Sequence, residues 1–213
     1  MDFEAIILAG GKGLRMNSDL PKSLVQIAGV PLIFHQLDYL VPKVDKIILS
    51  LGYGGDLVKK EIEKNYKNFD IKIEFILEEK PLGTAGAIKK SLAKIKSNKF
   101  LVLNSDDLTN INLEKLKQAE KNAICVARPR LPFGLVKEKD GQVIFIEKPK
   151  LNSWASCGWY LFEKEKLFPL LPDEGSLEYE VLPKLDLMIF KHKGYWYPIN
   201  TPKDIIEFEK NRS

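Results

Sequence analysis

The sequence has few cysteines and no long apolar segment. Its two cysteines, Cys125 and Cys157, show no metal-binding spacing, and two cysteines do not make a disulfide scaffold. No apolar run approaches the ~18 residues of a membrane span, and the chain enters a strand-like segment directly instead of a signal peptide. These absences argue against a disulfide-rich secreted domain and a membrane protein. We therefore expect a cytoplasmic protein with no membrane partner.

The sequence also lacks a strong excess of charge of one sign. The net charge is +4 over 213 residues, and the lysines are scattered along the chain rather than clustered. This balance suits anionic small molecules but does not support binding to nucleic acid. There is no internal repeat, low-complexity tract or linker. We expect one domain over residues 1–213, with a core at 1–130 and a smaller lobe with a closing helix at 131–213.

The first half of the sequence alternates strand-like and helix-like segments. Short apolar runs predict buried strands, and the amphipathic segments between them predict helices. The strands are expected at 5–9, 46–50, 71–77 and 100–103, and the helices at 31–41, 56–66 and 84–95. This alternation predicts an α/β fold with a Rossmann-like, doubly wound sheet. Ligands of such sheets bind at the carboxyl ends of the strands, so Gly10, Glu78 and Asp106 should face one cleft.

The second half is richer in strands. A turn at Lys139-Asp140-Gly141 predicts a hairpin, and Thr201 followed by Pro202 predicts the start of a closing helix. The expected elements are hairpin strands at 133–137 and 142–147, further strands at 157–162 and 188–192, and helices at 178–185 and 202–210. These strands make the sheet mixed and add a small inserted β lobe.

A glycine-rich loop follows the first predicted strand. Gly10, Gly11 and Gly13 lie within four positions, where glycine permits positive φ and a close approach of the backbone to a ligand. Successive N–H groups of such a loop can bind an anion, and Arg15 and Lys22 add two cations, so a polyphosphate is the expected guest. The glycine spacing matches neither a Walker loop nor a dinucleotide-binding fingerprint. The alternative is a strand-to-helix turn that happens to be rich in glycine.

Five motifs follow the order found in sugar-1-phosphate nucleotidyltransferases. Residues 8–15 (LAGGKGLR) with 21–22 (PK) resemble the family signature L-A-G-G-x-G-T-R-L and P-K, with Leu14 where the family usually has Thr. The resemblance implies the nucleotide-diphospho-sugar transferase fold and suggests that Arg15 and Lys22 hold the leaving pyrophosphate. The residues of this loop that it implies for nucleotide binding are Leu8, Ala9, Gly10, Gly11 and Gly13.

Residues 78–87 (EEKPLGTAGA) resemble the second nucleotide-contacting loop of the family, E-x-P-L-G-T-A-G-A. The resemblance implies that Gly83 and Thr84 lie beside the nucleotide. Glu78 stands where uridylyl- and thymidylyltransferases often carry Gln. A carboxylate accepts hydrogen bonds but cannot donate them, and guanine offers two adjacent N–H donors, so Glu78 favours GTP. The alternative is that the acidic residues stabilise the N-terminus of the following helix.

Carboxylates also follow the fourth predicted strand. Asp106 and Asp107 are well placed there to hold Mg²⁺, which prefers oxygen ligands; the alternative is that they cap the helix near Ile111. By the resemblance Asp106 is the metal ligand, and Asp107 assists it. In the motif W-x-D-I-G-T-P, Pro198 stands at the position of the second metal-binding Asp and cannot bind a metal through its side chain. We therefore expect Asn200, two residues later, to act as the second ligand.

Three further positions point to the sugar by resemblance. Residues 145–149 (FIEKP) resemble F-x-E-K-P, which implies that Glu147 binds sugar hydroxyls and that Lys148 contacts the sugar phosphate. Ser156 stands where the family usually has a sugar-binding Asn. Glu178 lies in a segment similar to the S-x-E-K of mannose- and heptose-1-phosphate guanylyltransferases. The resemblance thus implies a nucleotide-binding core at 1–130 and a sugar-binding lobe with a closing helix at 131–213.

The sequence therefore predicts a Mg²⁺-dependent enzyme that transfers a nucleotidyl group from an NTP, GTP by preference, to a sugar 1-phosphate. Arg15, Lys22 and Lys148 are the predicted catalytic residues, and the enzyme is expected to be a monomer or a homodimer. One alternative is a cytidylyl- or uridylyltransferase that acts on another phosphorylated alcohol. The other is a catalytically silent relative that binds an NDP-sugar, an explanation that departures such as Pro198 keep open.

Overall fold

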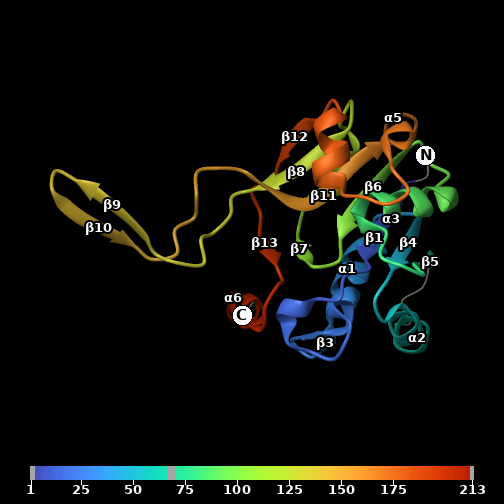
Figure 1. Ribbon diagram of the computed structural model, residues 1–213, viewed down its shortest axis with the longest axis horizontal. Coiled ribbons are helices and arrows are strands. Elements are labelled where there is room, and N and C mark those ends of the chain that lie inside the picture. The colour runs from blue at the N-terminus through green and yellow to red at the C-terminus, as the bar shows by residue number, and fades with distance from the viewer. Residues whose placement is uncertain (1–2, 67–70, 212–213) are drawn as a thin grey trace.

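A seven-stranded sheet forms the centre of the computed structural model, which describes residues 3–66 and 71–211 (Figure 1). Its strand order is β12-β8-β11-β6-β1-β4-β5. The strands are β1 (Glu4–Ala9), β4 (Lys46–Leu51), β5 (Lys72–Leu77), β6 (Lys99–Asn104), β8 (Ala123–Ala127), β11 (Ala155–Glu163) and β12 (Met188–Lys191). Neighbours run parallel except at β11, which is antiparallel to both β6 and β8. The predicted mixed sheet is confirmed.

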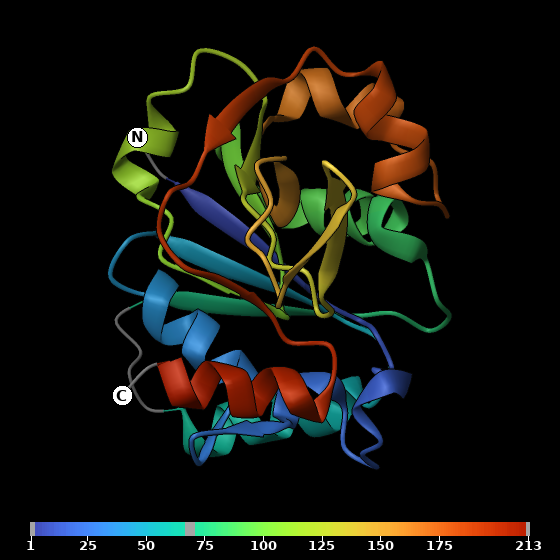
Figure 2. The same cartoon turned by 90° about the vertical axis from the view of Figure 1, so that its left-hand side faces the viewer.

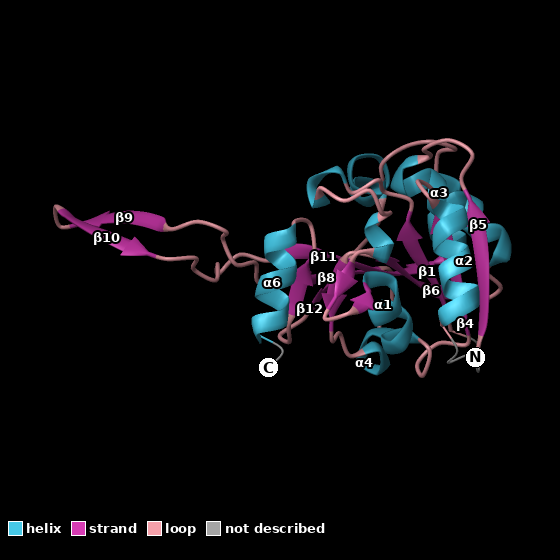
Figure 3. Ribbon diagram, turned by 90° about the horizontal axis from the view of Figure 1, so that it is seen from below, coloured by secondary structure: helices cyan, strands magenta, loops and turns pink. Residues whose placement is uncertain are grey.

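Helices cover both faces of this sheet (Figure 3). Successive side chains of a strand point to opposite faces, so Ile7 of β1 joins one buried cluster and Ile6 joins the other. The first cluster also holds α1 (Leu32–Leu40), α2 (Gly55–Asn65) and α4 (Leu113–Lys117), and the second holds α3 (Gly83–Ser91) and α5 (Lys164–Leu167). A third cluster packs α6 (Pro202–Asn211) near α1. None of the described helices is long and apolar enough to cross a bilayer.

Most predicted elements are present, with ends that differ by one or a few residues. The helix expected at 178–185 is wrong. A single π-helical turn, Leu177–Val181, is followed by a 3₁₀ turn, Leu182–Lys184. Pro183 lies inside the predicted segment, where it removes a backbone donor and its ring clashes with the preceding turn of an α-helix.

The remaining strands form three small ribbons. They are β2 (Gln26–Ile27) with β3 (Val30–Pro31), β7 (Asp107–Thr109) with β13 (Trp196–Pro198), and β9 (Leu135–Lys139) with β10 (Gln142–Ile146). The second of these ribbons ties the end of the chain to the segment after β6.

The third ribbon projects from the body as an arm, which Figure 1 shows in profile and Figure 2 shows end-on. Its turn is Asp140-Gly141, with φ of +53° and +74°. Positive φ at both central residues is typical of a type I′ turn, which suits the twist of a hairpin. The predicted hairpin is thereby confirmed, and the small β lobe expected in the second half takes the form of this arm.

Candidate active site

A cavity of about 710 Å³ opens at the carboxyl ends of β1, β4, β5 and β6. Gly10, Glu78 and Asp106 all line it, as the doubly wound topology predicts. The predicted nucleotide-binding residues that line it are Leu8, Gly10, Gly11, Glu78, Gly83 and Thr84. Ala9 instead belongs to the buried core, and Gly13 packs against the side chain of Lys22, which lines the cavity.

Gly13 permits the loop to bend tightly around Lys22. Its φ is +65°, and a Cβ at this position would lie 2.7 Å from Cβ of Lys22. A larger residue would therefore displace Lys22. A Cβ on Gly10 would lie 3.0 Å from Oε1 of Glu78, whereas one on Gly11 would meet nothing within 4 Å. Gly13 and Gly10 thus allow close packing against Lys22 and Glu78. Gly11 has open space beside its backbone.

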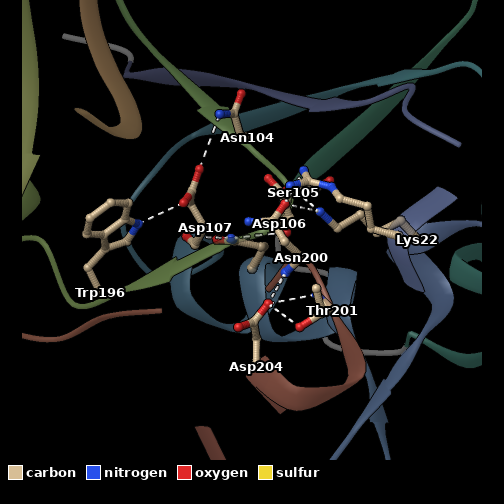
Figure 4. Close-up of polar contacts among 11 residues, drawn as sticks. Lys22, Asn104, Ser105, Asp106, Asp107, Trp196, Asn200, Thr201 and Asp204 are labelled. Carbon is tan, nitrogen blue, oxygen red and sulfur yellow. Dashed lines mark hydrogen bonds and ion pairs between the residues drawn. The ribbon is translucent and has the colours of Figure 1, made fainter. Parts of the chain in front are cut away.

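The ammonium group of Lys22 joins the two predicted metal ligands (Figure 4). Its Nζ forms an ion pair with Oδ2 of Asp106 and donates a hydrogen bond to Oδ1 of Asn200 over 3.1 Å. Nη2 of Arg15 donates to the same amide oxygen over 2.9 Å, across 185 positions of sequence. The structure thus brings Arg15, Lys22, Asp106 and Asn200 together, as the sequence predicts.

Distant elements hold the turn that carries Asp106. Nε2 of Gln36, in α1, donates to two carbonyl oxygens of the turn over 3.3 and 3.0 Å. Nε1 of Trp159, in β11, donates to the carbonyl oxygen of Asp107 over 3.0 Å. The N–H of Ile199 donates to the carbonyl oxygen of Asp106 over 2.8 Å. A helix, a strand and the segment after β13 therefore jointly position Asp106.

Asp107 points away from Lys22 in Figure 4. Its buried carboxylate accepts hydrogen bonds from Nε1 of Trp196 over 2.7 Å and from Nδ2 of Asn104 over 3.2 Å. Burial, reinforced by the neighbouring charge of Asp106, raises the pKa of Asp107 to about 7. Asp107 therefore changes charge near neutral pH, unlike an ordinary aspartate.

The alternative in which the two aspartates cap the next helix is wrong. α4 follows Asn112, whose Oδ1 accepts a hydrogen bond from the N–H of Lys115 over 3.0 Å. The backbone of β11 instead makes room for Asp107. Gly158 has a φ of +70°, and a Cβ there would lie 2.0 Å from Oδ2 of Asp107. Only glycine leaves space for the carboxylate at this point.

The side-chain oxygens around Lys22 are suitable ligands for a magnesium ion that also binds a polyphosphate. Oxygens of Asp106 and Asn200 converge on a cation, which in this structure is the Lys22 ammonium group. Mg²⁺ is commonly held by one or two protein groups together with water and substrate phosphates. Within residues 3–66 and 71–211, no group of three or more His, Cys, Asp or Glu side chains could hold a metal ion. A magnesium site with only two protein ligands, Asp106 and Asn200, would take its remaining ligands from water and substrate phosphates.

Glu78 lies directly after β5, and each of its carboxylate oxygens accepts a hydrogen bond. Oε1 accepts a hydrogen bond from Oγ of Ser50 over 3.1 Å, and Oε2 accepts one from the N–H of Leu82 over 3.3 Å. Leu82 precedes α3, so the alternative role of an acidic residue at a helix N-terminus also applies to Glu78. Each carboxylate oxygen keeps a second lone pair, which can accept from a ligand in the cavity.

Of the predicted sugar-binding residues, Glu178 contacts Thr84 in the cavity wall, and Ser156 contacts Tyr160. Oε2 of Glu178 accepts a hydrogen bond from Oγ1 of Thr84 over 2.9 Å. Oγ of Ser156 lies 3.1 Å from the hydroxyl oxygen of Tyr160. Burial raises the pKa of Tyr160, and the charge of Glu178 adds to this effect. Ser156 is thus held against Tyr160, and Glu178 is held against Thr84.

Glu147 and Lys148 lie instead at the root of the arm. Nη1 of Arg130 donates to the carbonyl oxygen of Lys148 over 3.5 Å, and Lys148 has a φ of +43°. Neither Glu147 nor Lys148 lines the 710 Å³ cavity. A second cavity of about 410 Å³ borders the arm root. Its basic and aromatic lining consists of Arg128, Arg130, Lys150, Tyr195, Trp196 and Tyr197.

Sequence reasoning missed several residues of the site, among them Lys12, Tyr53, Gln36 and Trp159. Lys12 and Tyr53 line the first cavity, with Nζ of Lys12 5.1 Å from the ring centroid of Tyr53. Tyr53 follows the strand predicted at 46–50, so the carboxyl-end rule could have identified it. Gln36 and Trp159 position the Asp106 turn, but periodicity indicates only that such side chains are buried, not what they bind.

Comparison with known proteins decides the family. Residues 4–211 match the sequence model of the nucleotidyl transferases. The chain belongs to the nucleotidyl transferase family. The resemblance given by the five sequence motifs is confirmed, and so is the α/β fold, since solved members with the same architecture match the whole chain.

Two curated relatives of this nucleotidyl transferase are named for one sugar phosphate. Mannose-1-phosphate guanylyltransferase catalytic subunit beta of Xenopus tropicalis is 31% identical over 96% of this chain and 63% of that protein. Mannose-1-phosphate guanyltransferase of Emericella nidulans is 30% identical over 96% of this chain and 62% of that protein. This chain therefore spans a little over three fifths of the length of these relatives.

A solved structure matches over its full length. HddC from Yersinia pseudotuberculosis, crystallised with GMP-PN, has a TM-score of 0.81 and 29% identity, and the match covers 100% of both chains.

Proposed function

We propose that this protein is a Mg²⁺-dependent enzyme that transfers the guanylyl group of GTP to a sugar 1-phosphate and releases pyrophosphate. The observation that carries this proposal is the convergence of Arg15, Lys22, Asp106 and Asn200 beside a cavity that Glu78 also lines. The names of the guanylyltransferase relatives and the guanine nucleotide bound to HddC support it.

The proposed reaction is an in-line displacement at the α-phosphorus of GTP. An oxygen of the sugar phosphate forms the new bond to phosphorus, and the bond to the bridging oxygen of pyrophosphate breaks. Such a transfer needs positioning and charge neutralisation more than a covalent nucleophile. Asp106 and Asn200 would hold Mg²⁺, which neutralises phosphate charge when bound. Arg15 and Lys22 would neutralise the pyrophosphate as it leaves.

We propose that the sugar binds on the Ser156 and Glu178 side of the first cavity. Both residues carry groups that can hydrogen-bond sugar hydroxyls, and Glu178 already contacts Thr84 in the cavity wall. Glu147 and Lys148 stay predicted contacts of the sugar and its phosphate. They would act from the arm root, which lies between the arm and the paired residues Ala127 of β8 and Ala155 of β11.

We also place this reaction in the cytoplasm. Cys125 and Cys157 are free and buried. Burial raises the pKa of the Cys157 thiol to about 12, so it stays protonated and unreactive. Cysteines that form no disulfide framework are typical of proteins in a reducing compartment.

Pyrophosphate release tests the proposal. The purified protein with Mg²⁺ should release pyrophosphate only when GTP and a sugar 1-phosphate are both present, and GTP should outcompete UTP and dTTP. Glu78→Gln should reduce the preference for GTP, because an amide at this position donates as well as accepts. Glu120→Gln removes the same charge at an exposed position that does not line the cavity and should leave the preference unchanged. A wild type that works best with UTP would contradict the assigned base.

A further inference from the structure

A hydroxyl group interrupts the apolar run 47–51 of β4. It belongs to Ser50, which is fully buried and lies between Leu8 of β1 and Ile76 of β5 in the sheet. A buried hydroxyl group costs free energy unless it forms a hydrogen bond. Oγ of Ser50 donates to Oε1 of Glu78 over 3.1 Å. Alanine would fit the same apolar surroundings without needing a partner, so packing alone does not explain a serine at this position.

The carboxylate that Ser50 contacts is confined from several directions. Gly10 lies against Oε1 of Glu78, because a Cβ at this glycine would be 3.0 Å from that oxygen. The other oxygen, Oε2, accepts from the N–H of Leu82 over 3.3 Å. One donor thus comes from β4 and the other from the residue before α3. Together they fix the direction in which the Glu78 carboxylate faces the first cavity.

This fixed direction matters for a base that offers two donors at once. The N1–H and the 2-amino group of guanine lie side by side and point the same way, so one carboxylate can accept from both. Hypoxanthine has the N1–H alone, and uracil has a single N–H between two acceptors. Accepting from two donors requires both oxygens of Glu78 to face the same edge of the base. It therefore depends on the orientation of the carboxylate more than a single hydrogen bond does.

We propose that Ser50 is a positioning residue for the choice of base: its hydroxyl group holds the Glu78 carboxylate in the orientation that accepts from both N–H donors of guanine. The inference rests on the proposed function, because it assumes that Glu78 contacts the base. Ser50 is fully buried, so it acts through Glu78 and does not touch the nucleotide.

Binding of GTP and of inosine triphosphate (ITP) tests this role. ITP differs from GTP only by the missing 2-amino group. Titration calorimetry with Mg²⁺ and without a sugar phosphate measures both affinities in the absence of transfer. The wild type should bind GTP about tenfold more tightly than ITP, because ITP lacks one hydrogen bond to a charged group. In Ser50→Ala the two affinities should lie within about threefold of each other, mainly through weaker binding of GTP.

Ser91→Ala is the matched control. Ser91 is also fully buried, and its Oγ donates to the carbonyl oxygen of Ala87 over 2.8 Å inside α3. The substitution removes the same atom at the same degree of burial, away from Glu78. It should leave the ratio of the GTP and ITP affinities within about twofold of the wild-type ratio. Thermal unfolding would show that both serine variants are folded.

A double-mutant comparison tests whether Ser50 acts through Glu78. Glu78→Gln and the double variant Ser50→Ala with Glu78→Gln should show the same ratio of GTP and ITP affinities. The reason is that the hydroxyl group has no carboxylate left to orient. A further loss of preference in the double variant would overturn the inference, because Ser50 would then act by another route.

Other results separate this inference from the proposed function. A wild type that prefers GTP, together with Ser50→Ala that keeps the full preference, would overturn the role of Ser50 alone. Equal weakening of GTP and ITP by Ser50→Ala would also overturn it and would indicate a general structural role. Equal binding of GTP and ITP by the wild type would reject both the role of Ser50 and the assigned base. Tighter binding of GTP without guanylyl transfer would contradict only the proposed reaction.

Discussion

Among single residues, Pro198 marks the largest departure from the motif of the family. It lies directly opposite Asp107 in the ribbon of β13 and β7. Asp107 is buried and turned toward Trp196, so it does not replace the missing ligand beside Lys22. Asn200, two residues after Pro198, reaches Lys22 with its amide oxygen. The contacts therefore support a ligand that has moved by two residues.

Substitutions at Asn200 test this shift through the dependence of the rate on Mg²⁺. Asn200→Ala should raise the Mg²⁺ concentration for half-maximal rate. Asn200→Asp should lower it, because a carboxylate binds this hard cation better than an amide. The measurement is the initial rate of pyrophosphate release over a Mg²⁺ titration at fixed GTP.

Pro198→Asp is the matched variant, since it restores the residue of the family. If Asn200 is the ligand, Pro198→Asp should change the half-saturating Mg²⁺ concentration little. A large gain of activity in Pro198→Asp, with no effect of Asn200→Ala, would instead indicate a decayed site and favour a silent, NDP-sugar-binding protein.

The buried carboxyl group of Asp107 should make stability depend on pH. Its pKa is raised to about 7 in the folded protein from 3.8. A raised pKa means that the folded state holds the proton of Asp107 more tightly than the unfolded state does. The contribution of this proton to the free energy of unfolding is therefore complete below about pH 4 and is lost as the pH rises through about 7. Asp107→Asn should remove this dependence. Its oxygen can accept from Trp196, and the amide of Asn104 can turn to accept from it.

Urea unfolding at pH 5 and pH 8 measures this difference. The wild type should lose more free energy of unfolding than Asp107→Asn between the two values. Groups remote from Asp107 titrate equally in both proteins and cancel in the comparison. An equal loss in the two proteins would show that Asp107 is ionised in the folded state throughout this range.

At the scale of secondary-structure elements, α1 and β11 act on the site through the turn between β6 and β7. Gln36→Ala would remove a donor from the carbonyl oxygens of Ser105 and Asp107, of which only that of Asp107 keeps the hydrogen bond from Trp159. We expect a loss of about 1–3 kcal/mol in the free energy of unfolding, the cost of buried unsatisfied groups. The turnover should fall as well, because Asp106 loses its support. Gln26→Ala, an exposed position in β2, should change neither quantity. Unchanged stability in Gln36→Ala would contradict the support assigned to α1.

The same elements show how far sequence reasoning reaches. Apolar runs such as 46–50 predict β4 well, because burial on both faces leaves a continuous signal. Pro183 ended the predicted helix at 178–185, and its effect was readable from the sequence. The projection of the arm was not readable. Local pattern predicts a hairpin at Asp140-Gly141, but nothing local says that the ribbon stands away from the body and leaves Val143 and Phe145 exposed.

At the scale of the whole molecule, the fold brings four distant residues to one place. Position after a predicted strand identified Asp106, and motif resemblance identified Arg15, Lys22 and Asn200; the structure joins all four. Contacts between segments that are far apart in the sequence could not be predicted. Trp159 is an example, because its Nε1 donates from β11 to the turn that carries Asp106. The roles of Glu147 and Lys148 stay predictions.

Substitutions of Asp106 and Lys22, where these distant segments meet, should affect catalysis more than folding. Asp106→Asn and Lys22→Ala each remove one charge from the phosphate site. Loss of one such group typically costs ~3–4 kcal/mol of transition-state stabilisation, or about 10²–10³ in turnover. Thermal unfolding should show that both variants keep the fold. Near-normal rates in either would contradict its assigned role.

The fate of the phosphates of GTP tests the central claim most directly. The wild type is incubated with Mg²⁺, a sugar 1-phosphate such as mannose 1-phosphate, and GTP that carries ³²P at either the α or the γ position. Guanylyl transfer predicts that the α label moves into a GDP-sugar and that the γ label appears in pyrophosphate. Label from the γ position in the sugar product, or in free phosphate without GDP-sugar, would contradict it.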